Sequence, residues 1–331
     1  MLPYYHFQVS QPSGLPGCVD VGVEGDLTMA SISSDAEAGF VPDAQSKGTA
    51  PATPQGGDLV KRHRLSTRLW HWFNAFTIFI MIMSGLMIFN AHPMLYWGQY
   101  GADDDHPWFE INNTDTTGYV KLGNVKFTTT GVLGLSKYPD GTVNDNAFPS
   151  WVTLPAEYDL AKARRWHLTF AWLLVLPYVL YMLWSLANRH IWRDLAPERS
   201  ELTPRHLWQD VIDHARLRFP KGAAALHHNT LQKFAYLGVL FVLIPLMILT
   251  GLTMSPGMTA AWPWLLWLFH GRASARSLHF IGMSLIVGFI LIHLALVIVV
   301  GPYNEIRSMI TGKFRLPRER KTSASVEGAK S

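Results

Sequence analysis

Four long apolar segments constrain this 331-residue chain more than any other feature. Each provides the roughly 20 consecutive apolar residues that a helix needs to cross the hydrocarbon core of a bilayer. None contains Asp, Glu, Lys or Arg, whose insertion at a helix centre costs about 2.5–3.5 kcal/mol. The sequence therefore predicts an all-α membrane protein, a four-transmembrane-helix bundle. The predicted spans run from Leu69 to Phe89, from Trp166 to Ala187, from Phe234 to Met254 and from Ser277 to Val300.

The low content of charged residues and of cysteine excludes several further classes of protein and of metal site. Apolar residues make up 49% of the chain and charged residues 16%, which is too apolar for a disordered protein. A single cysteine, Cys18, excludes an internal disulfide framework, a Cys-ligated iron–sulfur cluster and a covalently attached haem c. The net charge of +4 is modest. Because the basic residues are sorted by position, we interpret them as topology signals and expect no nucleic-acid partner.

The distribution of Lys and Arg predicts how the chain sits in the membrane. Residues 1–68, 188–233 and 301–331 carry 20 of them, whereas the loops 90–165 and 255–276 carry 8. By the positive-inside rule, both termini are cytoplasmic and the chain is a multi-pass protein of the bacterial inner membrane. Loop 90–165 is then periplasmic, with a predicted hairpin over Tyr119–Leu135. The Trp-rich stretch Ala260–Phe269 is too short to span and is interrupted by Pro263, so it is expected in the membrane interface.

The sequence predicts one membrane domain with a solvated segment at each end of the chain. Residues 1–60 are rich in Gly, Pro, Ser, Ala and Asp, without helical periodicity, and predict a disordered cytoplasmic leader. Residues 61–316 form the membrane domain, and residues 317–331 a disordered cytoplasmic tail. Met29 is an alternative start that would remove Cys18; the sequence leaves both starts open.

Four histidines lie inside the predicted spans, where an ionisable side chain marks a functional site by default. His71 is in the first span, His167 begins the second, and His279 and His293 lie in the fourth. Their separation of 14 residues is close to four helical turns, so His279 and His293 share a face at two depths about 21 Å apart. Chain direction then places His167 level with His279 near the outer surface and His71 nearest the level of His293. The sequence predicts two histidine pairs, one in each leaflet.

Paired imidazoles suit haem iron, because the porphyrin supplies the equatorial nitrogens and the helices only the axial ligands. Zinc would require further protein ligands, and none is available at these depths. With both axial positions filled, no coordination site is open to a substrate, so such haems carry electrons. We therefore predict two haems b as cofactors and no catalytic residue. The predicted ligands of the haem iron are the pairs His71/His293 and His167/His279.

Further residues near the outer pair have two interpretations each. Gly85 follows His71 by 14 residues, at the depth of the outer pair, where it leaves room for a porphyrin edge or serves ordinary helix packing. Three arginines flank His167 and His279, and either pair with haem propionates or anchor the helices at the interface. These are Arg164, Arg165 and Arg276.

The sequence also carries a set of short motifs around these histidines. They are Trp70-His71-Trp72-Phe73-Asn74, Ser84-Gly85, Arg165-Trp166-His167, Asn229-x-x-Gln232-Lys233, and Leu278-His279-Phe280 followed by Ile292-His293. Together they resemble the bacterial di-haem cytochrome b family. This family includes the cytochrome b subunit of nickel hydrogenase, the gamma subunit of formate dehydrogenase and the cytochrome b subunit of thiosulfate reductase. The resemblance covers about residues 62–316.

The resemblance implies a membrane-anchoring cytochrome b subunit of a respiratory chain. Such a subunit passes electrons between the quinone pool and a periplasmic oxidoreductase partner, a molybdenum-type or other metalloenzyme, and has no substrate site of its own. In the formate dehydrogenase branch the quinone lies near the inner haem, which implies Asn229 and Gln232 as quinone-binding residues. The alternative is that Asn229 or Thr230 merely caps the third helix.

Two other functions remain open at this point. One is a stand-alone quinol-oxidising cytochrome b that reduces a soluble periplasmic acceptor. The other is a haem-free membrane anchor, in which the four histidines are replaceable without loss of function. The histidine clusters of a di-metal hydroxylase and the His-Glu-x-x-His motif of a zinc protease are absent from the sequence.

Overall fold

The computed structural model describes residues 57–101, 105–187, 203–216 and 230–316. All of them belong to one compact unit, Thr53–Ser331. Most of the predicted leader, with Cys18 and Met29, lies outside the described residues. The predicted tail, residues 317–331, also lies outside them.

Within these described residues, four helices are long and apolar enough to cross a membrane. They are α1 (Leu65–Asn90), α2 (Leu160–Ala187), a composite helix over Thr230–Met254, and α8 (Arg272–Val300). Each begins four to six residues before the predicted span. Each predicted span starts directly after a basic residue, because charged residues were left out of the spans. The helices nevertheless include these basic residues, since long basic side chains reach water from the membrane interface.

The composite third helix contains a local change of winding. It consists of α4 (Thr230–Gly238), a π-helical segment (Val239–Leu243) and α5 (Ile244–Met254). Pro245 is the second residue after the π segment, and it has no backbone N–H to donate to the preceding turn. The hydroxyl of Tyr178 instead donates to the carbonyl of Leu240 at 2.8 Å. This hydrogen bond joins α2 to the third helix in the turn before Pro245, which the proline cannot serve as a donor.

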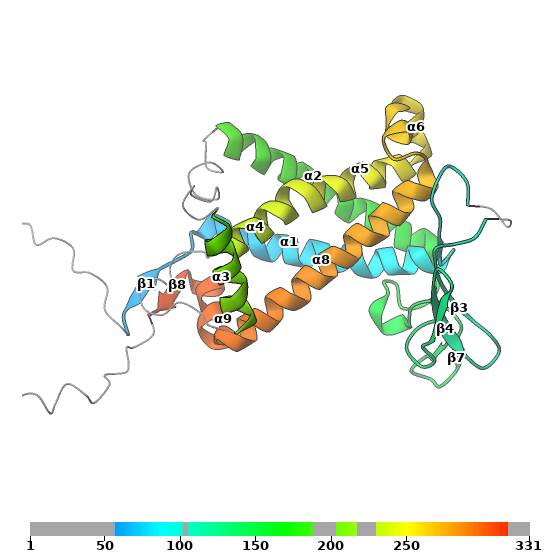
Figure 1. The fold of residues 1–331 in the computed structure, drawn as a ribbon, viewed down its shortest axis with the longest axis horizontal. Helices are drawn as coiled ribbons and strands as arrows, with labels where there is room; N and C mark the ends of the chain where they lie inside the picture. The colour runs from blue at the N-terminus through cyan, green and yellow to red at the C-terminus, as the bar shows by residue number, and fades with distance from the viewer. Residues whose placement is uncertain (1–56, 102–104, 188–202, 217–229, 317–331) are drawn as a thin grey trace, which may run out of the picture. The chain divides into compact units, whose positions relative to one another are not determined.

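The helices pack mainly as two pairs, α1 with α2 and α5 with α8, and α8 crosses the bundle obliquely (Figure 1). Large apolar side chains cover the outside of these helices, as lipid contact requires. The exposed ones include Phe76, Leu180, Val242 and Leu291. The predicted multi-pass helical membrane fold is therefore confirmed at this level.

The segment between α1 and α2 is not a plain loop. It holds an antiparallel sheet in the order β2 (Met94–Leu95), β3 (Phe109–Asn113), β4 (Gly118–Leu122) and β5 (Val125–Thr128). The predicted hairpin is β4–β5, turning at Gly123 with φ +56°. The description of the fold as all-α was therefore wrong for this segment, where alternating β-branched and aromatic residues form strands. A second small sheet pairs β6 (Ser136–Lys137) with β7 (Val143–Asn144), and a short 3-10 helix covers Ser150–Val152.

This sheet segment is fixed to the ends of the spanning helices. Its core contains Leu95 and Ile111 together with Phe89 at the end of α1, and Phe280 of α8 packs against it. The indole N–H of Trp108 donates to Ser277 Oγ on α8 at 3.0 Å. The sheet segment is thus held against the part of α8 that carries His279.

Two further short helices connect α5 to α8. They are α6 (Pro256–Ala261) and α7 (Trp264–Leu268), and Pro263 lies between them, as the sequence suggested. Trp262, Trp264 and Trp267 are exposed. Exposed tryptophans of this kind are typical of the bilayer interface.

The opposite end of the bundle is closed by the two ends of the described chain (Figure 1). Strand β1 (Leu59–Lys61) pairs antiparallel with β8 (Lys313–Arg315), beside α3 (Pro204–Ala215) and α9 (Pro302–Thr311). Arg62 Nη1 lies 3.1 Å from both carboxylate oxygens of Glu305. Residues 57–60, which we assigned to the leader, are therefore part of the folded domain.

Candidate functional site

The structure brings His71 of α1 and His293 of α8 together at the end of the bundle near β1 and β8. Their ring centres are 6.3 Å apart and the ring planes are inclined by 55°. Aromatic side chains line the pair: Trp72 meets His71 edge-on, and Phe289 stacks on His293. We refer to His71 and His293 as the inner pair.

The structure also brings His167 of α2 together with His279 of α8. Their ring centres are again 6.3 Å apart, with the planes inclined by 62°. We refer to these two residues as the outer pair. Because 14 residues of α8 separate His279 from His293, the two pairs lie at two levels of the bundle, about 21 Å apart along that helix.

Both separations fit one metal ion between two imidazoles. An ion bonded to one nitrogen of each ring at about 2 Å would place the ring centres about 6 Å apart. Within the described residues, no group of three or more His, Cys, Asp or Glu side chains is positioned to hold a metal. Each pair therefore offers two protein ligands, which suits a metal whose other ligands come from a macrocycle such as haem.

The hydrogen bonds of the outer pair leave one nitrogen of each ring available. His167 Nδ1 lies 3.1 Å from the carbonyl of Met81, and since a carbonyl only accepts, Nδ1 carries the hydrogen. His279 Nδ1 lies 2.8 Å from Thr250 Oγ1. With both Nδ1 atoms engaged by the protein, the lone pair of each Nε2 remains for a metal.

Gly85 lies at the level of the outer pair, as its spacing from His71 predicts. A Cβ at this position would stand 3.3 Å from Cε1 of His167. The side chain that occupies the space left by the glycine is therefore the imidazole of His167, which differs from both interpretations that the sequence offered.

The predicted arginines are engaged differently. Arg276 donates to the backbone carbonyl of His92 and stands over the ring of Phe89. Sequence reasoning missed Arg272, which donates to Thr259 Oγ1 at 2.8 Å. Both arginines line a hollow of about 500 Å³ at the start of α8, one to two turns from His279. Arg164 and Arg165 are exposed at the start of α2.

Of the two predicted quinone residues, Gln232 lies within the described residues. Gln232 lies in the first turn of α4, and α4 lies toward the end of the bundle that carries β1 and β8 (Figure 1). Asn229 lies outside the described residues. The buried Thr230 is the first residue of α4.

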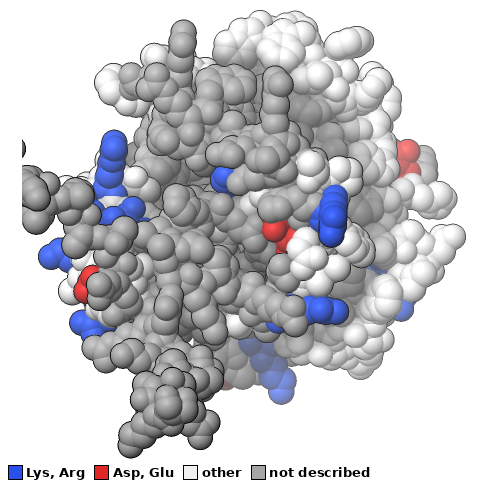
Figure 2. Space-filling view, turned by 60° about the vertical axis from the view of Figure 1, so that its left-hand side comes forward, with Lys and Arg blue, Asp and Glu red and all other residues white. Residues whose placement is uncertain are grey.

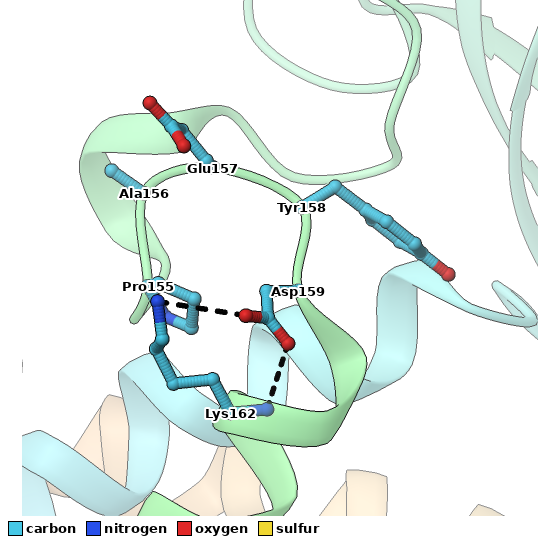
Figure 3. Close-up of a pocket in the computed structure, with 6 residues that line it drawn as sticks. All are labelled: Pro155, Ala156, Glu157, Tyr158, Asp159 and Lys162. Carbon is cyan, nitrogen blue, oxygen red and sulfur yellow. Dashed lines mark hydrogen bonds and ion pairs between the residues drawn. The ribbon is translucent and has the colours of Figure 1, made fainter.

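A shallow pocket before α2 is lined by Pro155, Ala156, Glu157, Tyr158, Asp159 and Lys162 (Figure 3). Asp159 and Lys162 are already paired with each other, since the backbone N–H of Lys162 donates to Asp159 at 2.8 Å and the two side chains form an ion pair at 3.5 Å. It contains no histidine, so it is a surface feature separate from the two pairs.

The described residues thus combine four helices long and apolar enough to cross a membrane with two facing histidine pairs at two levels, the features of a helical membrane protein with paired histidines inside its bundle. The model of the prokaryotic cytochrome b561 family matches residues 62–312, and the chain belongs to this family. The expected cytochrome b resemblance is thereby confirmed. Membership implies that the chain binds haem b and takes part in electron transfer in a membrane.

The chain is also similar to a curated protein of Azospira oryzae. That relative is described as the putative protein-methionine-sulfoxide reductase subunit YedZ1. The two are 25% identical over 233 residues, which cover 70% of this chain and 88% of the relative. No solved structure matches the chain.

Proposed function

We propose that this chain is a membrane-anchoring cytochrome b subunit that transfers electrons between a periplasmic oxidoreductase and the quinone pool. The observation that carries the proposal is the equal 6.3 Å separation within the inner and the outer histidine pair. In this account the axial ligands of two haems b are His71/His293 and His167/His279. Each haem, when bound, would carry one electron and would have no coordination position open to a substrate.

The depth of the two pairs supports transfer across the membrane. His279 and His293 lie near opposite ends of one spanning helix, so a redox centre would lie in each leaflet. The role of this chain is then to hold both centres in fixed positions and to connect the two surfaces.

The charge at the two ends supports cytoplasmic termini in the inner membrane of a bacterium. Figure 2 turns the end with β1 and β8 forward and shows Lys and Arg over the described surface, with fewer Asp and Glu. A cytoplasmic surface carries this excess of basic residues. Among the described residues, the basic ones at this end are Lys61, Arg62, Arg64, Arg68, Arg205, Arg216, Lys233, Arg307, Lys313 and Arg315.

The sheet segment β2–β7 is our candidate platform for the partner. It is folded and fixed to α8 beside the outer pair, so a protein docked there would lie close to His279. The partner in this proposal is a periplasmic molybdenum-type or other metalloenzyme. The description of the Azospira relative as a reductase subunit supports an oxidoreductase partner.

In this proposal the quinone binds at the inner end, beside the inner pair. Gln232 in α4 offers an amide at that end, where water is near enough to exchange protons. Asn229 belongs to the same proposed site. Lipid surrounds the apolar helix faces.

Reduction of the purified chain by a quinol tests the proposal. The full chain in lipid nanodiscs, mixed anaerobically with a water-soluble quinol, should show rapid reduction of haem b in its optical spectrum. Gln232→Ala should slow this reduction about tenfold or more without loss of haem. Gln209→Ala, in α3 at the same end, is the matched control and should reduce at the wild-type rate. Quinol that leaves the haems oxidised contradicts the quinone role.

A further inference from the structure

A five-residue pattern occurs twice in the spanning helices. Residues 81–85 of α1 read Met-Ile-Met-Ser-Gly, and residues 247–251 of α5 read Met-Ile-Leu-Thr-Gly. Both copies have the order methionine, isoleucine, an apolar residue, a hydroxyl residue and glycine. Each copy lies on a helix that packs against a helix with one histidine of the outer pair. Helix α1 packs against α2, which contains His167, and α5 packs against α8, which contains His279.

The two copies make equivalent contacts with the two histidines. Ser84 Oγ lies 3.1 Å from Nδ1 of His167, and Thr250 Oγ1 lies 2.8 Å from Nδ1 of His279. A Cβ added to Gly251 would stand 3.6 Å from Cε1 of His279, as one added to Gly85 would stand 3.3 Å from Cε1 of His167. In each copy the glycine lets the imidazole approach the helix, and the hydroxyl then meets its Nδ1.

The direction of these hydrogen bonds follows from the other contacts of the hydroxyls. Ser84 Oγ donates to the carbonyl of Ile80 at 2.8 Å, and Thr250 Oγ1 donates to the carbonyl of Leu246 at 2.6 Å. Because a hydroxyl has one hydrogen, its oxygen accepts from the imidazole N–H, which in His167 is shared with the carbonyl of Met81 at 3.1 Å. Ser84 and Thr250 are both fully buried, so water does not compete for these bonds.

In the part of the chain that the structure describes, His71 of the inner pair lacks an equivalent hydrogen bond to its Nδ1 atom. The Nδ1 atom of His71 is buried and has no hydrogen-bond partner within the described residues. A histidine ligand whose second nitrogen donates a hydrogen bond is more basic and is fixed in orientation. The more basic ligand favours the oxidised metal, and second-shell bonding of this kind tunes haem potentials.

We infer that Ser84 and Thr250 are positioning residues that orient His167 and His279 and lower the reduction potential of the outer haem alone. The inference rests on the proposed function, because it requires a haem at each pair. The duplicated pattern is then a device that distinguishes the two haems within one chain.

A redox titration of hydroxyl-deleted chains tests this inference. The full chain in nanodiscs is titrated anaerobically with mediators and followed in the haem b absorption band, with haem content measured in parallel. The double variant Ser84→Ala/Thr250→Val should keep two haems. The equilibrium constant for reduction of one haem should rise about tenfold, which is about 59 mV, while the other haem keeps its midpoint.

The matched control is Thr253→Val. Thr253 is equally buried on α5, and its hydroxyl donates to the carbonyl of Leu249 at 2.7 Å. It belongs to no repeat and should leave both midpoints unchanged. The hydroxyl-retaining variant Ser84→Thr/Thr250→Ser should behave as wild type. If the deleted variant loses one haem instead of shifting its midpoint, the hydroxyl-retaining variant should restore two.

Three results would overturn the inference. They are unchanged midpoints in the deleted variant, an equal shift of both haems, and a hydroxyl-retaining variant as defective as the deleted one. A wild-type chain with fewer than two haems would instead contradict the proposed function, so the two failures are distinguishable.

Discussion

A Cβ built on Gly85 would lie 3.3 Å from Cε1 of His167, so the imidazole of α2 rests directly on the backbone of α1. A real Cβ at that distance would be closer than an ordinary van der Waals contact, so a larger side chain would displace the ring. The glycine thereby sets the position of the outer pair.

Gly85→Val should remove one of the two haems, because its branched side chain displaces His167. Haem content per chain and the reduced-minus-oxidised spectrum measure this. Gly288→Val in α8 is the control, since a Cβ there meets no atom within 4 Å, and it should keep both haems. A Gly85→Val chain with two haems and an unchanged spectrum would show that the contact does not constrain the outer pair.

Alanine at the four histidines should divide them into two groups. His167→Ala and His279→Ala should each remove the same haem, and His71→Ala and His293→Ala should each remove the other. Ligands of one metal act as a unit, so the double variant His167→Ala/His279→Ala should lose no more haem than either single variant. The exposed His106 of the sheet segment provides the control, and His106→Ala should retain two haems. Loss of different haems from His167→Ala and His279→Ala would refute the pairing.

The sheet segment should lose stability in strong alkali. Tyr119 donates to the carboxylate of Glu110 at 3.0 Å, and burial, followed by this bond and the charge of Glu110, raises the pKa of Tyr119. A raised pKa favours the neutral phenol in the folded state. The stability is therefore present below the ordinary pKa of about 10 and is lost as the pH rises through the raised value.

Ultraviolet titration of tyrosinate, as the difference between wild type and Tyr119→Phe, measures this pKa. Glu110→Gln should lower the pKa of Tyr119, because it removes the carboxylate charge. An unchanged pKa in Glu110→Gln would mean that Glu110 does not act on Tyr119.

The closure of the inner end should depend on the Arg62–Glu305 ion pair. Its side chains are 16% and 20% exposed, and removal of one partner leaves the other poorly solvated. Glu305→Gln should cost about 1 kcal/mol locally, seen as roughly fivefold faster amide exchange in β1 and β8. Lys162→Ala breaks the exposed pair with Asp159 and should change amide exchange at the start of α2 little. Equal effects of the two variants would show that the Arg62–Glu305 ion pair has no special role in closing this end.

Bilayer physics made the spans and the two levels of histidines predictable. The absence of charge over 20 residues and the 14-residue interval between His279 and His293 are local properties that need no tertiary contact. The pairing of β1 with β8 was not predictable, because it joins residues about 250 positions apart. Neither were the strands of the outer segment beyond one hairpin, since short strands carry weak periodicity.

The contacts of Ser84 and Thr250 were also not anticipated, because they depend on which helix faces which. The signal that points to them is the repeated pattern at residues 81–85 and 247–251, which appears when the first and third spans are aligned. Sequence comparison between the spans of one chain therefore holds information that hydropathy alone does not.

Haem content of the purified full chain, expressed without a partner, tests the central claim most directly. A pyridine haemochrome assay with quantified protein, combined with a dithionite-reduced minus oxidised spectrum, counts the haems b for each chain. Two per chain is the result that the two histidine pairs predict. One or none would contradict the account and leave at least one pair of histidines without its proposed metal.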